Sequence, residues 1–324
     1  MKITLAKTAG FCFGVNRAVN MVYELIEKGE KVCTLGPIIH NPQLVSELES
    51  KGVRIVDSPE EVAEGEILVI RSHGVALDVM QRAEKLNVEL ADATCPFVAK
   101  IHKIVYDYSK DGYITIIAGD RNHQEVKGII GHCVGEYYVV SGTDELEELL
   151  VNNPDFKEKP LILVSQTTFN AEIWEKTQKN LKKVCTNAKI FDTICSATEE
   201  RQNEAALLSR ESDAMVIVGG RHSSNTRKLL SVCEGNCPAY LVETASELYG
   251  IPLSDYRSIG LTAGASTPAG IIKEVLETMS EIVNDNKMIE EERVLDSASA
   301  TEEFDFAAAL EESLNSMNSD QKVV

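Results

Sequence analysis

NVELADATC (residues 87–95) is an apolar, strand-like run that closes with an aspartate, two further residues and a cysteine. The same arrangement returns in NAKIFDTIC (187–195), and a third cysteine, Cys12, follows the strand-like KITLAKTAGF (2–11). A lone cysteine in such a place is most often a small buried hydrophobe. Three cysteines in equivalent places instead predict an internal repeat.

Between these cysteines lie β-rich apolar runs that break into polar, Gly-rich loops. The runs are VCTLGPIIHN (32–41), EILVIRSHG (66–74), YITIIAGDRNH (113–123), LILVSQTTFN (161–170), AMVIVGGRHSSN (214–225) and SIGLTAGAST (258–267). Helical patterns fill the gaps. NRAVNMVYELIEKG (16–29), for example, has apolar residues at helical spacing and ends at a glycine. The alternation of strand, loop and helix predicts α/β units with mostly parallel sheets.

These marks divide the chain into three similar units, which we place at residues 1–96, 97–195 and 196–283. The N-terminal strand belongs either to the first unit or to the third. Residues 284–324 form an acidic tail that we exclude from the fold and interpret as a linker, disordered or partly helical in FDFAAALEESL (304–314). A chain of 324 residues is longer than one hydrophobic core usually serves, which agrees with several units.

Composition excludes several classes of protein. The chain has a formal net charge of −19, which argues against nucleic-acid binding by the catalytic region. It has no apolar run long enough for a membrane span or a signal peptide, so we expect no membrane association. Eight cysteines without a secretory leader indicate a reducing, cytoplasmic setting in which thiols bind metal or pack in cores.

In parallel α/β sheets, the loops that follow the strands gather at one edge, beside the N-termini of the next helices. Cys12, Cys95 and Cys195 would then meet at a shared centre. Three thiolates suit either a zinc ion with one open position or a [4Fe–4S] cluster with one iron that lacks a protein ligand. The other cysteines are assigned to packing: Cys33, Cys133, Cys185, Cys233 and Cys237.

The remaining loops carry compact polar groups. They are His40, His73, His123, Ser223, Ser224, Asn225 and Ser266. Ser and Asn ahead of helices often act only as N-caps, but helix amides, hydroxyls and imidazoles together also hold phosphate. Glu125 is either a solvated glutamate or, beside a metal and a phosphate, a general acid.

The motifs GFCFGV, GPIIHNP, RSHGV, DATCPFV, NHQEVKG, SQTT, DTICSAT, RHSSNT and TAGAST stand in the order found in the 4-hydroxy-3-methylbut-2-enyl diphosphate reductase family, which the chain resembles over about residues 1–283. The resemblance implies three α/β units with pseudo-threefold symmetry around a central [4Fe–4S] cluster held by Cys12, Cys95 and Cys195. It implies diphosphate binding by His40, His73, Ser223, Ser224, Asn225 and Ser266, with His123 nearby. Glu125 would supply protons and Thr167 would place the substrate hydroxyl. Gln124 departs from the proline of many members, and the tail is similar to the linker that precedes a fused C-terminal domain in some of them.

The implied reaction is the reductive dehydroxylation of (E)-4-hydroxy-3-methylbut-2-enyl diphosphate to isopentenyl and dimethylallyl diphosphate, the last step of the methylerythritol phosphate route. No dinucleotide or flavin motif is present, so we expect electrons from a reduced ferredoxin or flavodoxin. We also expect a monomeric enzyme. Two other hypotheses stay open. One is an iron–sulfur hydro-lyase, although the chain has no C-x-x-C pair, and the other is a non-enzymatic cluster sensor.

Overall fold

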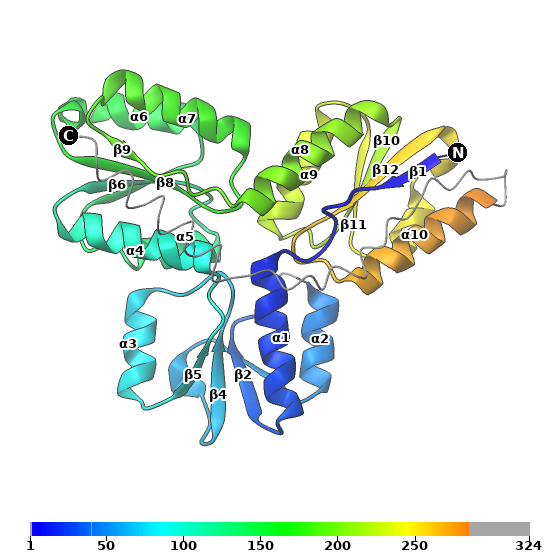
Figure 1. Cartoon of the computed structure of the whole chain (residues 1–324), viewed down its shortest axis with the longest axis horizontal. Helices are drawn as coiled ribbons and strands as arrows, with labels where there is room; N and C mark the ends of the chain where they lie inside the picture. The colour runs from blue at the N-terminus through cyan, green and yellow to red at the C-terminus, as the bar shows by residue number, and fades with distance from the viewer. Residues whose placement is uncertain (1, 40, 285–324) are drawn as a thin grey trace. The chain divides into compact units, whose positions relative to one another are not determined.

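The structure, a computed structural model, describes residues 2–39 and 41–284 of the chain (Figure 1). The described residues form three four-stranded sheets, and every strand pair in them is parallel. Helices separate the strands along the chain. The predicted α/β units with parallel sheets are therefore confirmed.

The first sheet has the strand order β3-β2-β4-β5. Its strands are β2 (Lys31–Leu35), β3 (Arg54–Val56), β4 (Glu66–Ile70) and β5 (Glu89–Asp92). The helices around it are α1 (Phe13–Glu27), α2 (Pro42–Ser50), the short 3₁₀ turn η1 (Pro59–Glu61) and α3 (Leu77–Lys85). Helices α1 and α2 pack in one hydrophobic cluster with this sheet, and α3 packs in a second one. Helices thus cover both faces, as parallel sheets require.

The second sheet repeats this order as β7-β6-β8-β9. Its elements are α4 (Pro96–Lys110), β6 (Ile114–Ala118), α5 (Gln124–Ile130), β7 (Tyr137–Val140), α6 (Thr143–Asn152), η2 (Pro154–Lys157), β8 (Leu161–Ser165), α7 (Ala171–Val184) and β9 (Lys189–Ile190). Alternate residues of β6 point to opposite faces. Ile116 packs with α6 and α7, whereas Ile117 packs with α4 and α5.

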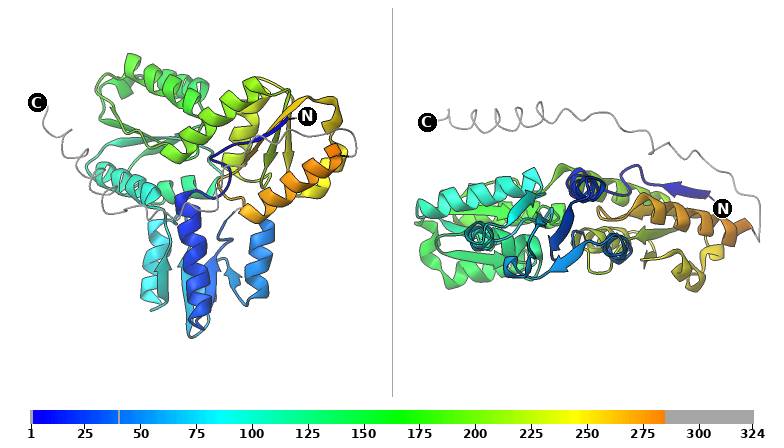
Figure 2. Two further views of the ribbon diagram at one scale, coloured as in Figure 1. Left: turned by 45° about the vertical axis from the view of Figure 1, so that its right-hand side comes forward. Right: turned by 90° about the horizontal axis from the view of Figure 1, so that it is seen from below.

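The third sheet has the order β11-β10-β12-β1, so the N-terminal strand pairs with a strand from the far end of the described chain (Figures 1 and 2). Its elements are β1 (Lys2–Leu5), α8 (Ser196–Glu211), β10 (Ala214–Val218), α9 (Ser224–Glu234), β11 (Ala239–Val242), η3 (Ala245–Gly250), η4 (Leu253–Asp255), β12 (Ser258–Ala263) and α10 (Ala269–Asn284). In all three sheets, the strand before a marked cysteine occupies the same edge: β5, β9 and β1. This equivalence is the structural form of the repeat in the sequence.

Three helix starts differ from the sequence-based expectation. The helical pattern from residue 16 gives a helix that begins at Phe13. A second helical pattern, EERQNEAALLSRE (199–211), predicts a helix that in the structure begins at Ser196. Helix α4 begins at Pro96 and was not anticipated. Cysteine carries no capping signal, which is why sequence patterns miss these starts. Each of these helices therefore begins directly after a marked cysteine.

The expected acidic tail, including its helical stretch, lies outside the described residues from residue 285 onward. Within the described part of the chain, no helix is both long and apolar enough to cross a bilayer.

Candidate active site

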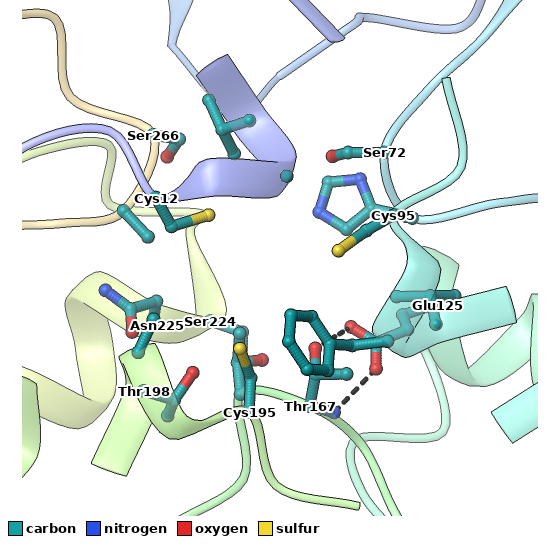
Figure 3. A pocket seen from close by; sticks show the side chains of 18 of the residues that line it. Cys12, Ser72, Cys95, Glu125, Thr167, Cys195, Thr198, Ser224, Asn225 and Ser266 are labelled. Atoms are coloured by element: carbon teal, nitrogen blue, oxygen red, sulfur yellow. Dashed lines mark hydrogen bonds between the residues drawn. The ribbon is translucent and has the colours of Figure 1, made fainter. Parts of the chain in front are cut away.

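The three marked cysteines line one cavity. Cys12, Cys95 and Cys195 are the N-cap residues of α1, α4 and α8, and each is partly buried. Figure 3 shows their sulfur atoms directed into the same open space. A helix N-terminus carries a partial positive charge, so each thiol stands where a negative charge is stabilised. The fold thus brings together three cysteines that are far apart in the sequence.

The surroundings of these thiols act in opposite directions on their ionisation. Burial raises the pKa of the Cys95 thiol to about 12, and the amides of Phe97 and Val98 oppose this. The pKa of Cys195 is also raised, mainly by burial and against the amides of the next turn, with a further contribution from Cys12. A metal group binds cysteines as thiolates, whereas burial favours the protonated thiols of Cys95 and Cys195. A positively charged group bound in the cavity would favour the thiolates.

The cavity wall at Cys95 leaves no room for a side chain on the neighbouring helix. A Cβ atom added to Gly14 would lie 2.7 Å from Cys95 Sγ. This close approach explains why the motif after Cys12 contains glycine at its second position. The backbone of α1 therefore reaches the Cys95 thiol directly, and the two cysteine loops share one wall.

On the other side of the cavity lies an acidic group held by two short hydrogen bonds. The Thr167 backbone N–H donates to Glu125 Oε1 at 2.6 Å, and Thr167 Oγ1 donates to Glu125 Oε2 at 2.7 Å. Glu125 is only 1% exposed. Burial raises its pKa to about 7, and the two Thr167 contacts limit the rise. A carboxyl group in this range changes protonation near neutral pH, as a general acid should.

The histidines divide into three cases. His123 is the N-cap of α5, and its Nδ1 accepts a hydrogen bond from the Glu125 N–H at 3.2 Å. With Nδ1 accepting, the neutral imidazole carries its proton on Nε2. The His73 ring packs edge-on against that of His123, with centroids 5.4 Å apart, and both residues line the cavity. His40 lies outside the described residues.

The polar residues of the third unit also line the cavity, but they differ in whether their side chains have hydrogen-bond partners. Ser223 is the N-cap of α9, with its Oγ accepting from Thr226 N–H at 3.4 Å, so the capping interpretation holds for it. Both amide atoms of Asn225 and the Oγ of Ser266 are buried without a hydrogen-bond partner among the described residues. Buried polar atoms are rarely left unpaired. These unpaired groups are available to form hydrogen bonds with a polar ligand.

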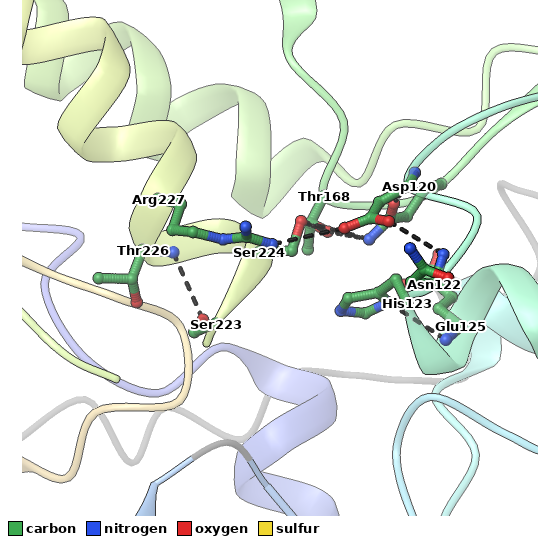
Figure 4. A network of polar contacts seen from close by, with 10 residues as sticks. Asp120, Asn122, His123, Glu125, Thr168, Ser223, Ser224, Thr226 and Arg227 are labelled. Atoms are coloured by element: carbon green, nitrogen blue, oxygen red, sulfur yellow. Dashed lines mark hydrogen bonds and ion pairs between the residues drawn. The ribbon is translucent and has the colours of Figure 1, made fainter. Parts of the chain in front are cut away.

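Ser224 is held from the second unit. Thr168 Oγ1 donates to Ser224 Oγ at 3.1 Å, and Gln166 Nε2 lies 3.3 Å from the same atom. Farther out, Arg227 and Asp120 form an ion pair at 3.4 Å between the same two units (Figure 4). The loop after β8 and the start of α9 are therefore connected by polar contacts, and Ser224 has a fixed position before any ligand arrives.

Several cavity residues were not anticipated. Ser72, Thr168, Thr198 and Arg201 line the cavity, and Gln166 supports it. Gln124, which departs from the family pattern, accepts a hydrogen bond from Arg71 at 3.0 Å. The nearest sequence signal for Arg201 was its position less than two turns after Cys195 on an expected helix. Its orientation could not be read from the sequence.

The remaining cysteines lie away from this cavity. Cys33, Cys185 and Cys233 are fully buried in hydrophobic clusters, which confirms their assignment to packing. Cys133 and Cys237 are partly buried and contact such clusters.

Comparisons with known proteins agree with this geometry. The family model described as LytB protein matches residues 3–280. The 4-hydroxy-3-methylbut-2-enyl diphosphate reductase of Caldanaerobacter subterraneus subsp. tengcongensis is 43% identical over 292 residues, covering 89% of this chain and 99% of the relative. The reductase of the same name from Clostridioides difficile is 41% identical over 283 residues, covering 87% of this chain and all of the relative.

Solved structures give the same result. The E-1-hydroxy-2-methyl-but-2-enyl-4-diphosphate reductase of Plasmodium falciparum matches with a TM-score of 0.81 and 28% identity, covering 91% of this chain and 94% of that one. A second match is a structure of (E)-4-hydroxy-3-methyl-but-2-enyl diphosphate reductase, described as the terminal enzyme of the non-mevalonate pathway. It matches with a TM-score of 0.62 and 37% identity, covering 86% of this chain and 99% of that one. The resemblance read from the motifs is confirmed, and the hydro-lyase and sensor hypotheses lose their support. The chain belongs to the LytB family of 4-hydroxy-3-methylbut-2-enyl diphosphate reductases.

Proposed function

We propose that this enzyme removes the hydroxyl group of (E)-4-hydroxy-3-methylbut-2-enyl diphosphate, using two electrons and two protons and releasing water, to give isopentenyl and dimethylallyl diphosphate. The observation that carries the proposal is the composition of one cavity. Three cysteines, a buried acid and unpaired polar groups at a helix N-terminus all line it. These are the groups needed to deliver electrons, deliver a proton and hold an anion.

Cys12, Cys95 and Cys195 would hold a [4Fe–4S] cluster. Ligands of a single zinc ion lie about 2.3 Å from it, so their sulfur atoms crowd together. Among residues 2–39 and 41–284, no three Cys, His, Asp or Glu side chains are grouped closely enough to share one metal ion. The three cysteines that line this cavity are the ligand type that iron–sulfur clusters use. When bound, such a cluster supplies electrons and an open iron that acts as a Lewis acid.

The diphosphate would bind at the start of α9. Asn225 and Ser266 offer unpaired polar atoms there, Ser223 and Ser224 offer hydroxyls, and the helix N-terminus favours negative charge. His73 lies on the same cavity wall, and we assign His40 to this group from its motif. An acidic chain can hold the anion in this way without a cluster of lysines.

Glu125 would donate the proton to the departing hydroxyl oxygen. Its buried carboxyl group has both oxygens fixed by Thr167, so the proton is presented in one direction. Thr167 also lines the cavity and would place the substrate hydroxyl, and His123 lines the same cavity with Nε2–H as a donor. Hydroxide is a poor leaving group, so protonation during departure lowers the barrier.

The electrons would come from a reduced ferredoxin or flavodoxin, and the enzyme would act as a cytoplasmic monomer. The chain carries no dinucleotide- or flavin-binding motif, which supports an external protein donor.

The proposal is tested by incubating anaerobically reconstituted enzyme with substrate, with and without dithionite and a viologen mediator. We expect both products only when the reductant is present. Loss of the hydroxyl group without added electrons would contradict the proposal, because only a hydro-lyase removes water without reduction.

A further inference from the structure

Arg201 is a buried cation on the wall of the cavity, and the reaction as described above does not use it. It lies on α8 and is only 6% exposed. Its Nη1 donates to Ala197 O at 3.0 Å and its Nη2 donates to Gly10 O at 2.8 Å, across 191 residues of sequence. Its Nε atom is buried without a hydrogen-bond partner in the described part of the chain. The guanidinium thus joins the loop before Cys12 to the helix after Cys195.

This guanidinium has no carboxylate partner within ion-pair distance among the described residues. Burial lowers the pKa of Arg201, whereas negative charge at Cys12 and Cys195, which line the same cavity, and then at Glu200 and Glu204, would raise it. Glu200 is exposed. The Glu204 carboxylate accepts instead from Lys7 N–H, Thr8 N–H and Thr8 Oγ1, at 2.6 to 2.8 Å.

Arginine stays protonated in proteins, so Arg201 cannot avoid the free-energy cost of burying its charge by losing a proton. A buried, unpaired charge is costly unless an opposite charge compensates for it. An oxidised [4Fe–4S] core held by three thiolates carries one net negative charge, and one-electron reduction adds a second. The cavity beside Arg201 is therefore suited to an anionic group whose charge increases during reduction.

We propose that Arg201 is the counter-cation of the bound cluster and raises its reduction potential by stabilising the reduced, more negative state. The inference rests on the proposed cluster at Cys12, Cys95 and Cys195. Net charge and nearby hydrogen bonds are among the factors that set the potentials of iron–sulfur centres. Arg201 acts through the cluster and not on the substrate, so it is a positioning residue and not a catalytic one.

A matched control exists on α1. Arg17 donates to Thr94 O at 3.2 Å and to Asp92 O at 3.1 Å, close to another marked cysteine. Arg17 is only partly buried and does not line the cavity. Solvent screens such a charge, so its removal should affect the cluster much less than removal of Arg201.

The test compares anaerobically reconstituted wild type with Arg201→Gln, Arg201→Lys and Arg17→Gln. Iron and sulfide content are measured first, and the cluster midpoint potential is then obtained by a redox titration followed by absorbance and electron paramagnetic resonance. For Arg201→Gln we expect the equilibrium constant for one-electron reduction to fall by about tenfold or more, a shift of about 59 mV or more to lower potential. Arg201→Lys keeps the charge and should lie much closer to wild type, and Arg17→Gln should change the constant by less than about threefold.

The outcomes separate the two proposals. A loaded Arg201→Gln protein with the wild-type potential would overturn the role of Arg201 and leave the proposed function intact. If Arg201→Lys lost the cluster as completely as Arg201→Gln, the hydrogen bonds to Gly10 and Ala197 would be the essential contribution, and the electrostatic role would be wrong. A wild-type protein that takes up no cluster at all would instead overturn the proposed function, and this inference with it.

Discussion

The two polar sides of the cavity differ in how completely their hydrogen bonds are formed. On the acid side, Glu125 has both carboxyl oxygens bonded to Thr167. On the helix α9 side, Asn225 and Ser266 keep buried polar atoms without partners in the described part of the chain. Buried polar groups are normally satisfied. The acid is thus positioned before substrate arrives, whereas the opposite wall is completed only by a ligand.

The largest expected effect is on the acid side. Glu125→Gln keeps the size and most hydrogen bonding of the side chain but removes the proton, so kcat should fall by roughly 10²- to 10⁴-fold. Cluster content and KM should stay near wild type, because neither the cysteines nor the wall at α9 is changed. Steady-state kinetics with a chemical reductant measures both constants. If Glu125→Gln kept wild-type turnover at saturating substrate, another group would have to donate the proton, and His123 would be the next candidate.

A substitution in the opposite wall, at helix α9, should change both substrate binding and the free energy of unfolding. Asn225→Leu removes two unpaired buried polar atoms, so the free energy of unfolding should stay constant or rise by up to about 1–3 kcal/mol. The same change should raise KM by about tenfold or more, because hydrogen bonds to a charged diphosphate are lost. Chemical denaturation and steady-state kinetics check the two effects. His40→Ala should also act mainly on KM.

A loss of stability in Asn225→Leu without a change in KM would mean that this amide serves the fold and not a ligand. The contrast between the two walls would then be wrong.

The pH dependence sharpens the account of the acid side. Burial raises the pKa of Glu125 to about 7, so the protonated form that donates should persist up to neutral pH. We expect kcat to be level below about pH 6 and to fall about tenfold per unit well above pH 7. The Thr167 hydroxyl lowers this pKa, so Thr167→Val should move the descending limb to higher pH. A rate that rises through pH 7 would contradict the role of an acid.

The smallest effect is expected at the rim, where Arg227 and Asp120 join the second and third units. Their side chains are 53% and 42% exposed, so solvent screens the pair. Asp120→Asn keeps the hydrogen bond from Asn122 N–H to Oδ1 and should change the free energy of unfolding by less than about 1 kcal/mol. A double-mutant cycle with Arg227→Gln measures the coupling. A coupling of several kcal/mol would show that the rim, and not Ser224, joins the two units.

Much of this architecture could be predicted from local patterns. The run YITIIAGDRNH contains the strand β6 (Ile114–Ala118) and the His123 loop, because an apolar β-rich run that breaks into a polar turn is a local signal. The repeat of the marked cysteines predicted three units because equivalent strands precede them. Eleven of the twelve predicted site residues line the cavity, and the twelfth, His40, lies outside the described residues.

The parts that could not be predicted depend on contacts between distant segments. Arg201 meets Gly10 across 191 residues, and Ser224 meets Thr168 across 56. No local spacing encodes such pairs. The helix starts after the cysteines were missed for a different reason, since cysteine at an N-cap gives no signal comparable to serine or aspartate.

The central claim is that Cys12, Cys95 and Cys195 together hold one cluster on which reduction depends. The most direct measurement is the iron and sulfide content of anaerobically reconstituted wild type, Cys95→Ser and Cys133→Ser, the last as a control because Cys133 does not line the cavity. We expect about four iron and four sulfide per chain in wild type and Cys133→Ser, and loss of most of both in Cys95→Ser. A Cys95→Ser protein that keeps about four of each, with the wild-type visible spectrum, would contradict the account.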